Sequence, residues 1–414
     1  MAVADALGGV PDGARPLRRR VVGALVVVLA IGLACSITLS ETTLLVLAVV
    51  LLTGARPEAR WLRAPLAAPL LTFAGWTLIT AAASLEPGDS LRATKSLLTL
   101  ATFWIVLAAL PDAAAARRFA SVVFVCVAVV ALLSIVQVAG CVRGSFENVP
   151  RIPLLATFFT KCARAHGFFS IYMTLAGVLT VVLALTLPRL RGLPRVTLAT
   201  LGWLAGAVAL GLTLVRGAWL GFGVGAGLVL TLVRRRAAAL VLLVALVAVA
   251  LAIPSVHARL QTIGDPADDT TRDRLAMVAA GLRLVREHPI AGIGPGQVKR
   301  VYPAYAPPEA MRRHTSHLHN TPLQIAVERG LVGLALWLWI FAAFFARAGR
   351  VLRRVPENAV ADRALVVGAL AAVTAFLVAG LFEYNFGDTE VLLVILGVMA
   401  LPFVVERDLA GRPA

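Results

Sequence analysis

Histidines gather in a polar segment that directly precedes a long apolar stretch. His314, His317 and His319 are followed by Asn320. Imidazole gains and loses a proton near neutral pH, so one of these side chains is a candidate general base. We expect His314, like His257, to be simply solvated. Because no Asp, Glu or Cys lies near the cluster in sequence, we expect no metal site.

Three arginines are candidate anion-binding residues. Arg216 stands alone between two apolar stretches, where a charged side chain is costly and by default functional. The other interpretation is that Arg216 only extends to the polar surface of the membrane. Arg272 and Arg274 begin a predicted helix whose apolar face is formed by Leu275, Val278, Ala279, Leu282 and Val285. Such a helix suits a membrane surface or the roof of a cavity.

Two further features lie in polar segments. The run from His288 to Gly296 holds three glycines, whose turns could present backbone N–H groups to an anion, although most such runs are only turns. Cys141 and Cys162 would form a disulfide in an oxidising compartment, and two free thiols are the alternative.

The composition predicts an all-α polytopic membrane protein. Of 414 residues, 59% are apolar and 15% are charged, against roughly 25% charged in an average soluble domain. This excludes a soluble globular enzyme, a disordered chain and a small disulfide-rich domain. We predict about twelve transmembrane helices, at 21–38, 42–54, 64–83, 92–110, 118–140, 167–187, 196–214, 217–233, 237–254, 320–346, 364–383 and 389–405.

Arginine clusters predict the orientation of these helices. Lys and Arg number 39 against 22 Asp and Glu, and the arginines cluster in alternate connections. The positive-inside rule explains this better than nucleic-acid binding does, and it places both termini in the cytoplasm. Two long connections, 141–166 and 255–319, fall outside and still carry arginines. Long loops tolerate charge, and an anionic ligand on the outer face is the other explanation.

This topology divides the chain into three parts. Residues 1–254 hold transmembrane helices 1–9 and the outer loop 141–166. Residues 255–319 form a large outer loop with the amphipathic helix. Residues 320–414 hold helices 10–12 and a short cytoplasmic tail.

Three motifs resemble one known family. His319-Asn320, nine residues and then Gly330-Leu331-Val332-Gly333 resemble the H-[NSQ]-x9-G-x-x-[GTY] signature of the O-antigen ligase and polymerase superfamily. The run from Arg216 to Gly221 resembles the family's R-[GS]-x-W-[LI] turn, and the run from His288 to Gly296 its H-P-[LI]-x-G-[VI]-G-x-G segment. Glu383 and the short turn to Asp388 resemble the terminal hairpin of the family.

The resemblance implies a glycosyltransferase of GT-C architecture in the bacterial inner membrane, with its active site in the periplasm. The implied donor is a glycan on undecaprenyl diphosphate. An O-antigen ligase would transfer that glycan to lipid A–core, whereas polymerases and protein oligosaccharyltransferases of the same superfamily use other acceptors. The absence of an added soluble portion favours the ligase. Membrane lipids are the other expected partner, and neither a cofactor nor nucleic acid is expected.

Transfer from a lipid diphosphate assigns roles to the candidate residues. His319 is the predicted base, with His317 as its possible substitute or as an acceptor-binding residue. Arg216, with Arg272 or Arg274, would hold the diphosphate, because guanidinium grips two phosphate oxygens at once. Asn320 would orient His319 or bond a sugar. Trp219 would stack on a sugar, although most interfacial tryptophans only anchor a helix.

A lipid or solute transporter is the alternative from another class. Secondary transporters often place acidic residues near the middle of the membrane. We expect no Asp or Glu well inside a span of this chain, and this favours the enzyme.

Overall fold

The computed structural model describes residues 14–53, 63–142, 162–192, 197–232, 254–261 and 269–411, together with Val244. Within these ranges the secondary structure is helical and no strand occurs, which confirms the predicted all-α class. The helices are α1 (Ala14–Cys35), α2 (Ile37–Leu52), α3 (Ala67–Ala82), α4 (Pro87–Ala93), η2 (Thr94–Leu100), α5 (Ala101–Ala109), α6 (Ala113–Val142), α8 (Tyr172–Thr186), η4 (Leu187–Gly192), α9 (Leu198–Leu212), α10 (Arg216–Leu232), α12 (Pro254–Gln261), α13 (Asp269–Glu287), α14 (Val298–Tyr305), α15 (Thr321–Arg354), α16 (Val360–Ala379) and α17 (Thr389–Ala410).

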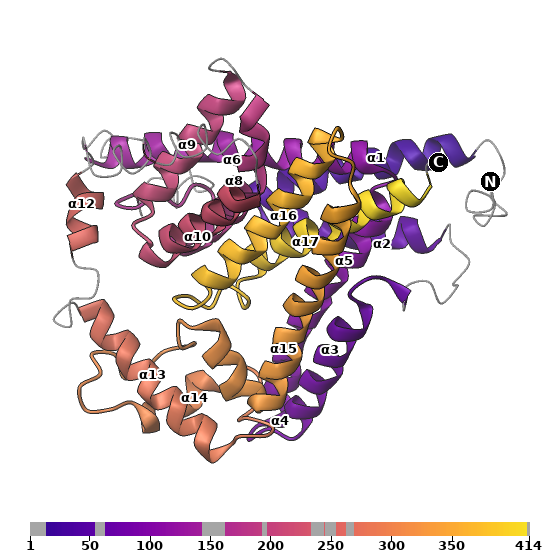
Figure 1. The fold of residues 1–414 in the computed structure, drawn as a ribbon. Helices are drawn as coiled ribbons and strands as arrows, with labels where there is room; N and C mark the ends of the chain where they lie inside the picture. The colour runs from indigo at the N-terminus through magenta and orange to yellow at the C-terminus, as the bar shows by residue number, and fades with distance from the viewer. Residues whose placement is uncertain are drawn as a thin grey trace.

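Six helical segments of the described chain are long and apolar enough to cross a membrane. They are Pro87–Ala109, Ala113–Cys141, Tyr172–Leu190, Thr321–Arg354, Val360–Ala379 and Thr389–Ala410. Four shorter apolar helices, α2, α3, α9 and α10, coincide with further predicted spans. The count of twelve is therefore not confirmed, and the predicted span 237–254 lies almost wholly outside the described residues. In Figure 1 the start of α1 and the end of α17 lie on the same side of the bundle.

Helices α8, α16 and α17 form the centre of the bundle and are the most buried of the candidate spans (Figure 1). Glycines let α10 approach α16 closely. A Cβ atom added at Gly221 would lie 2.5 Å from the Ala375 carbonyl oxygen, and one at Gly225 would lie 2.7 Å from that of Ala371. Small residues spaced by four are typical of helix packing in membranes, where close contact replaces the hydrophobic effect.

Helix α15 is broken at Gly330, which has a φ of +68° and a ψ of −178°. The run from His288 to Gly296 fills the break. Ile293 N–H donates to the Val327 carbonyl oxygen at 2.9 Å, and Gly294 N–H donates to that of Glu328 at 3.0 Å. On the other side of the break, Leu331 N–H donates to the carbonyl oxygen of Pro289 at 2.7 Å. This glycine-rich run therefore satisfies the backbone of a broken helix.

The predicted anion-binding role of that run is not supported by this arrangement. The N–H groups of Ile293 and Gly294 are taken by α15, and Gly296 N–H donates to Glu328 Oε1 at 2.9 Å. Left-handed φ values at Gly292, Gly294 and Gly296 explain the glycines, because they shape the turn that enters the break.

Helix α13 forms in the predicted outer loop, and a face made largely of small residues packs against α15. Ala276, Met277, Ala280 and Leu284 are buried, whereas Leu275 of the predicted apolar face is 60% exposed. The packing is close, since a Cβ atom added at Gly281 would lie 2.7 Å from a Leu323 methyl group of α15. In Figure 1, α13 and α14 lie beside one another and near the first turns of α15.

A disulfide joins the end of α6 to the segment before α8. Cys141 and Cys162 have Cα atoms 5.5 Å apart and are separated by 21 residues. The segment after Cys162 is held further by Gln137 of α6, whose side-chain oxygen accepts from the backbone N–H groups of His166 at 3.3 Å and Gly167 at 3.2 Å. This segment therefore has a fixed position on the bundle.

Candidate active site

The residue that precedes α15 is held between two elements. Asn320 caps α15, because its Oδ1 accepts from Leu323 N–H at 2.9 Å, and its Nδ2 donates to the Leu381 carbonyl oxygen at 2.9 Å. His319, the residue before Asn320, adopts a φ of +48°, which is uncommon for a residue other than glycine. Such strain persists only where the surroundings impose it, and it is often found at functional sites.

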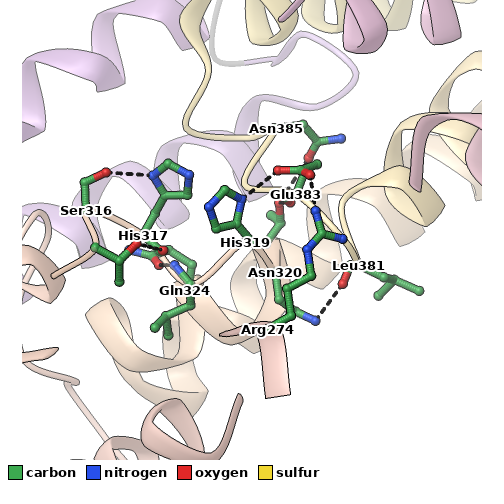
Figure 2. Close-up of polar contacts among 12 residues, drawn as sticks. Arg274, Ser316, His317, His319, Asn320, Gln324, Leu381, Glu383 and Asn385 are labelled. Atoms are coloured by element: carbon green, nitrogen blue, oxygen red, sulfur yellow. Dashed lines mark hydrogen bonds and ion pairs between the residues drawn. The ribbon is translucent and has the colours of Figure 1, made fainter. Parts of the chain in front are cut away.

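His319 is paired with an acidic residue 64 positions later in the chain. Its Nδ1 lies 2.8 Å from Glu383 Oε2, and both side chains are largely buried. The carboxylate accepts a hydrogen bond from the protonated Nδ1, so Nε2 keeps its lone pair. Within the described part of the chain, no hydrogen bond engages Nε2. Figure 2 shows Glu383 between the imidazole of His319 and the guanidinium of Arg274, which also forms an ion pair with Glu383.

His317 lies beside His319 but has a different environment. The two ring centroids are 4.4 Å apart, and the His317 ring is 5.9 Å from that of Tyr384. Ser316 Oγ lies 3.0 Å from His317 Nδ1. Burial, with the neighbouring His319, lowers the pKa of His317 to about 4 against the opposing effect of Glu383. His317 is therefore neutral at pH 7.

The structure separates the two arginines of α13. Arg274 reaches the His319–Glu383 pair, whereas Arg272 donates to Asp269 Oδ1 at 2.7 Å and to Met311 Sδ at 3.1 Å. Two residues apart on a helix are about 200° apart around its axis, so both cannot face one site. Only Arg274 joins the histidines.

Arg216 is the first residue of α10 and is half-buried. A Cβ atom added at its neighbour Gly217 would lie 2.5 Å from Phe382 Cβ, so the start of α10 lies against the turn that carries Glu383. Trp219 Nε1 donates to the Leu210 carbonyl oxygen at 2.9 Å, which ties α10 to the end of α9. Arg216 and Trp219 thus belong to the same end of the bundle as the histidines.

One buried acidic residue lies inside a predicted span and was not predicted from the sequence. Glu328 lies in the predicted span 320–346 and is only 3% exposed, contrary to the expectation that no span holds a buried acid. Its Oε2 accepts from Arg329 Nη1 at 2.7 Å, and its Oε1 accepts from Gln324 Nε2 at 2.8 Å and from Gly296 N–H. A signal was present, since adjacent Glu and Arg in an apolar stretch predict an ion pair.

Arg164 is a further positively charged residue near this end of the bundle, and it was not predicted from the sequence as a candidate. Arg164 follows the disulfide and stacks on Tyr172, with its Cζ 4.5 Å from the ring centroid. The next residue, Ala165, donates its N–H to the Leu212 carbonyl oxygen at 3.1 Å, close to the turn that leads to Arg216. The disulfide-linked segment therefore lies beside the α9–α10 turn.

The site residues do not form a metal cluster. Across the described residues, no group of three or more His, Cys, Asp or Glu is arranged to hold a metal ion.

An all-helical bundle with apolar spans and a histidine–carboxylate–arginine group at one end defines a membrane protein with a polar site. The family model "O-Antigen ligase" matches residues 200–338, a segment that includes Arg216, both loop arginines and both histidines. Over these residues the chain is similar to the O-antigen ligase family, and the resemblance predicted from its motifs is confirmed there. No curated protein matches the chain.

Proposed function

We propose that this chain transfers an O-antigen glycan from undecaprenyl diphosphate to lipid A–core at the periplasmic face of the bacterial inner membrane. The observation that carries the proposal is the group formed by His319, Glu383 and Arg274. This group combines a histidine that can accept a proton with an arginine that can bind a phosphate. The match of residues 200–338 to the O-antigen ligase family model supports a reaction of the ligase or polymerase type.

His319 is the proposed base. As the acceptor hydroxyl oxygen attacks the anomeric carbon of the donor, its proton passes to Nε2, the nitrogen without a partner in the described chain. Glu383 holds the Nδ1 proton and stabilises the imidazolium that forms. His317 is the less suitable base, because its lowered pKa makes it a weaker proton acceptor.

The bond from the anomeric carbon to the diphosphate oxygen breaks in the same step. The leaving diphosphate gains negative charge, which Arg216 and Arg274 stabilise in this proposal. Arg272 is the weaker candidate, since it faces Asp269 and Met311. With arginines in this role, no divalent metal is needed.

Two other predicted residues have supporting roles in the proposal. Asn320 orients His319 through the backbone, because both ends of its amide are already bonded to other parts of the chain. The indole N–H of Trp219 is also bonded, so Trp219 would offer only its ring face to a sugar. GT-C architecture, twelve spans and cytoplasmic termini belong to the same proposal.

The buried Glu328 does not favour a transporter. A carrier acid must exchange a proton or an ion, but Glu328 is bonded to Arg329, Gln324 and Gly296. Such a fully bonded carboxylate is typical of a structural ion pair.

Purified protein supplied with a lipid-linked glycan and lipid A–core, in the presence of EDTA, tests the reaction. A ligase gives glycan on lipid A–core and releases undecaprenyl diphosphate. Longer lipid-linked chains would assign the protein to polymerases, and glycan on protein to oligosaccharyltransferases. Movement of the donor between leaflets without release of undecaprenyl diphosphate would indicate a transporter. Activity that needs an added divalent metal would contradict the arginine mechanism.

The His319→Ala variant tests the base. We expect turnover to fall by ~10²–10⁴, with donor binding largely retained, because a general base typically contributes that much. The His317→Ala variant, which removes a neighbouring ring of the same type, is the matched control. Turnover is measured per folded molecule. An inactive His317→Ala beside an active His319→Ala would reassign the base, and activity in both would exclude a histidine base.

A further inference from the structure

A series of hydrogen bonds connects the first turns of α15 to the segment that carries the histidines. Gln324 Oε1 accepts from Leu318 N–H at 2.8 Å, and Leu318 lies between His317 and His319 in the sequence. Gln324 Nε2 donates to Glu328, and Glu328 accepts from Arg329. One arm of this hydrogen-bond network therefore runs from the Glu328–Arg329 ion pair to the backbone between the two histidines.

A second arm runs from the same ion pair to the other side of the histidines. The guanidinium of Arg329 interacts electrostatically with the phenol of Tyr384. The ring of Tyr384 lies 5.9 Å from that of His317, and Tyr384 is the residue next to Glu383. The ion pair is thus connected both to the histidine segment and to the turn that holds their carboxylate.

The ion pair is itself rigidly placed. Arg329 is 5% exposed, its Nε donates to Thr77 Oγ1 at 3.1 Å, and its carbonyl oxygen accepts from Trp76 Nε1 at 2.8 Å. Its Cζ lies 5.6 Å from the ring centroid of Phe73. These contacts attach the pair to α3, which the sequence places far from the histidines.

Stability alone does not explain a buried ion pair at this position. Well-packed apolar residues of similar size are often as stabilising as a buried pair, because desolvation of the charges offsets their attraction. A pair retained in an apolar helix therefore suggests a second requirement, and here both arms lead to the candidate base.

We propose that Glu328 and Arg329 are positioning residues, which set the distance and orientation between the His317–His319 segment and the Glu383 turn. The inference rests on the proposed function, since it assumes that this histidine group carries out the transfer. Neither residue touches the reacting atoms in this proposal. Both act through Gln324 and Tyr384.

Two variants test the positioning role. Arg329→Lys keeps the charge but cannot bond Glu328 and Thr77 in the same way, because lysine lacks the planar fork of donors. Tyr384→Phe keeps the ring beside His317 and removes only the hydroxyl that interacts with Arg329, so it separates positioning from folding. We expect kcat to fall roughly 10²-fold in Arg329→Lys and less in Tyr384→Phe, with the donor KM nearly unchanged, since a small misplacement of catalytic groups has effects of this size.

A second measurement does not depend on transfer. Diethyl pyrocarbonate modifies neutral imidazole, and peptide mass spectrometry gives its rate at each histidine across a pH series. We expect altered rates at His317 and His319 in both variants. Arg117→Lys is the matched control, because Arg117 forms an ion pair with the buried Asp362 in a different part of the bundle. It should leave both histidine rates and kcat unchanged.

The outcomes separate the two proposals. Unchanged histidine rates in Arg329→Lys and Tyr384→Phe would overturn the positioning role, whether or not kcat falls. Changed rates in Arg117→Lys as well would also overturn it, because the effect would then be general. If the rates change as expected but His319→Ala retains full transfer, the positioning role holds and the proposed function fails.

Discussion

His317 and His319 are separated by one residue, but their neighbours give the two side chains different properties. Glu383 accepts from His319 Nδ1, and within the described residues no hydrogen bond engages the opposite nitrogen. His317 has no carboxylate partner within the described structure, and burial lowers its pKa to about 4. The environment therefore distinguishes a candidate base from a neutral neighbour, which their sequence spacing alone cannot do.

The lowered pKa of His317 predicts a pH-dependent stability. The pKa of His317 is about 4 in the folded protein and about 6.5 for an unperturbed histidine, so the unfolded chain binds more protons between these values. The free energy of unfolding should therefore decrease as the pH falls from 6.5 towards 4. His317→Gln should lose less stability over this interval. Thermal unfolding of both proteins at several pH values measures the difference, and parallel curves would contradict the assigned environment.

Arg216→Lys should reduce transfer far more than its conserved charge suggests. Lysine cannot grip two phosphate oxygens with one planar group, and the loss of one such donor from a developing charge typically lowers kcat roughly 10²-fold. Arg350→Lys, at an exposed position in α15, is the control and should be nearly neutral. Near-normal transfer by Arg216→Lys would instead mean that the side chain only reaches the membrane surface.

Much of the candidate site could be predicted from local sequence, and the remainder depends on distant contacts. His319, Arg216 and Arg274 were found because their residue types and neighbours are unusual in an apolar chain. The partner of His319 was not found, since Glu383 lies 64 residues away and pairs with it only after α15 and α16 have packed. The choice between Arg272 and Arg274 likewise required the orientation of α13.

At the scale of a single element, α15 departs furthest from its sequence pattern. Its apolar residues predicted one continuous span, whereas the helix is broken at Gly330. Hydrophobic periodicity continues through the break and gives no sign of it. The break becomes visible only with the run from His288 to Gly296, whose N–H groups bond the freed carbonyls.

Gly330→Ala should therefore be strongly destabilising. The backbone conformation of Gly330 is accessible essentially to glycine alone, and an added Cβ atom would lie 1.8 Å from the Ile290 carbonyl oxygen. We expect a loss of about 3 kcal/mol or more in the free energy of unfolding. Gly349→Ala in the same helix is the control, because an added Cβ there meets nothing within 4 Å. Similar thermal stability in both variants would contradict the break.

At the scale of the whole molecule, composition predicted the helical class, and most predicted spans coincide with helices. The lengths of the helices were harder to predict, because α2, α3, α9 and α10 are short and pack against neighbouring helices. The face by which α13 packs against α15 was not predicted, because its small residues are less conspicuous in the sequence than Leu275.

The proposed orientation of the bundle predicts which surfaces can be labelled from outside. In a Cys35→Ala, Cys126→Ala background, Glu309→Cys replaces an exposed residue of the outer loop, and Asn358→Cys replaces an exposed residue between α15 and α16. A membrane-impermeant maleimide should label Glu309→Cys in spheroplasts and Asn358→Cys only after the membrane is opened. The reverse pattern would invert the proposed topology.

The break in α15 also has a consequence for the order of events during synthesis. Residues 288–296 leave the ribosome before Gly330 does, so the segment that completes the broken helix is made before the helix itself. In the proposed topology, this segment would already be across the membrane when α15 inserts. Its N–H groups would then be available to meet the exposed carbonyls of Val327 and Glu328 as they arrive. An α15 made before that segment would instead present an incomplete helix to the lipid first.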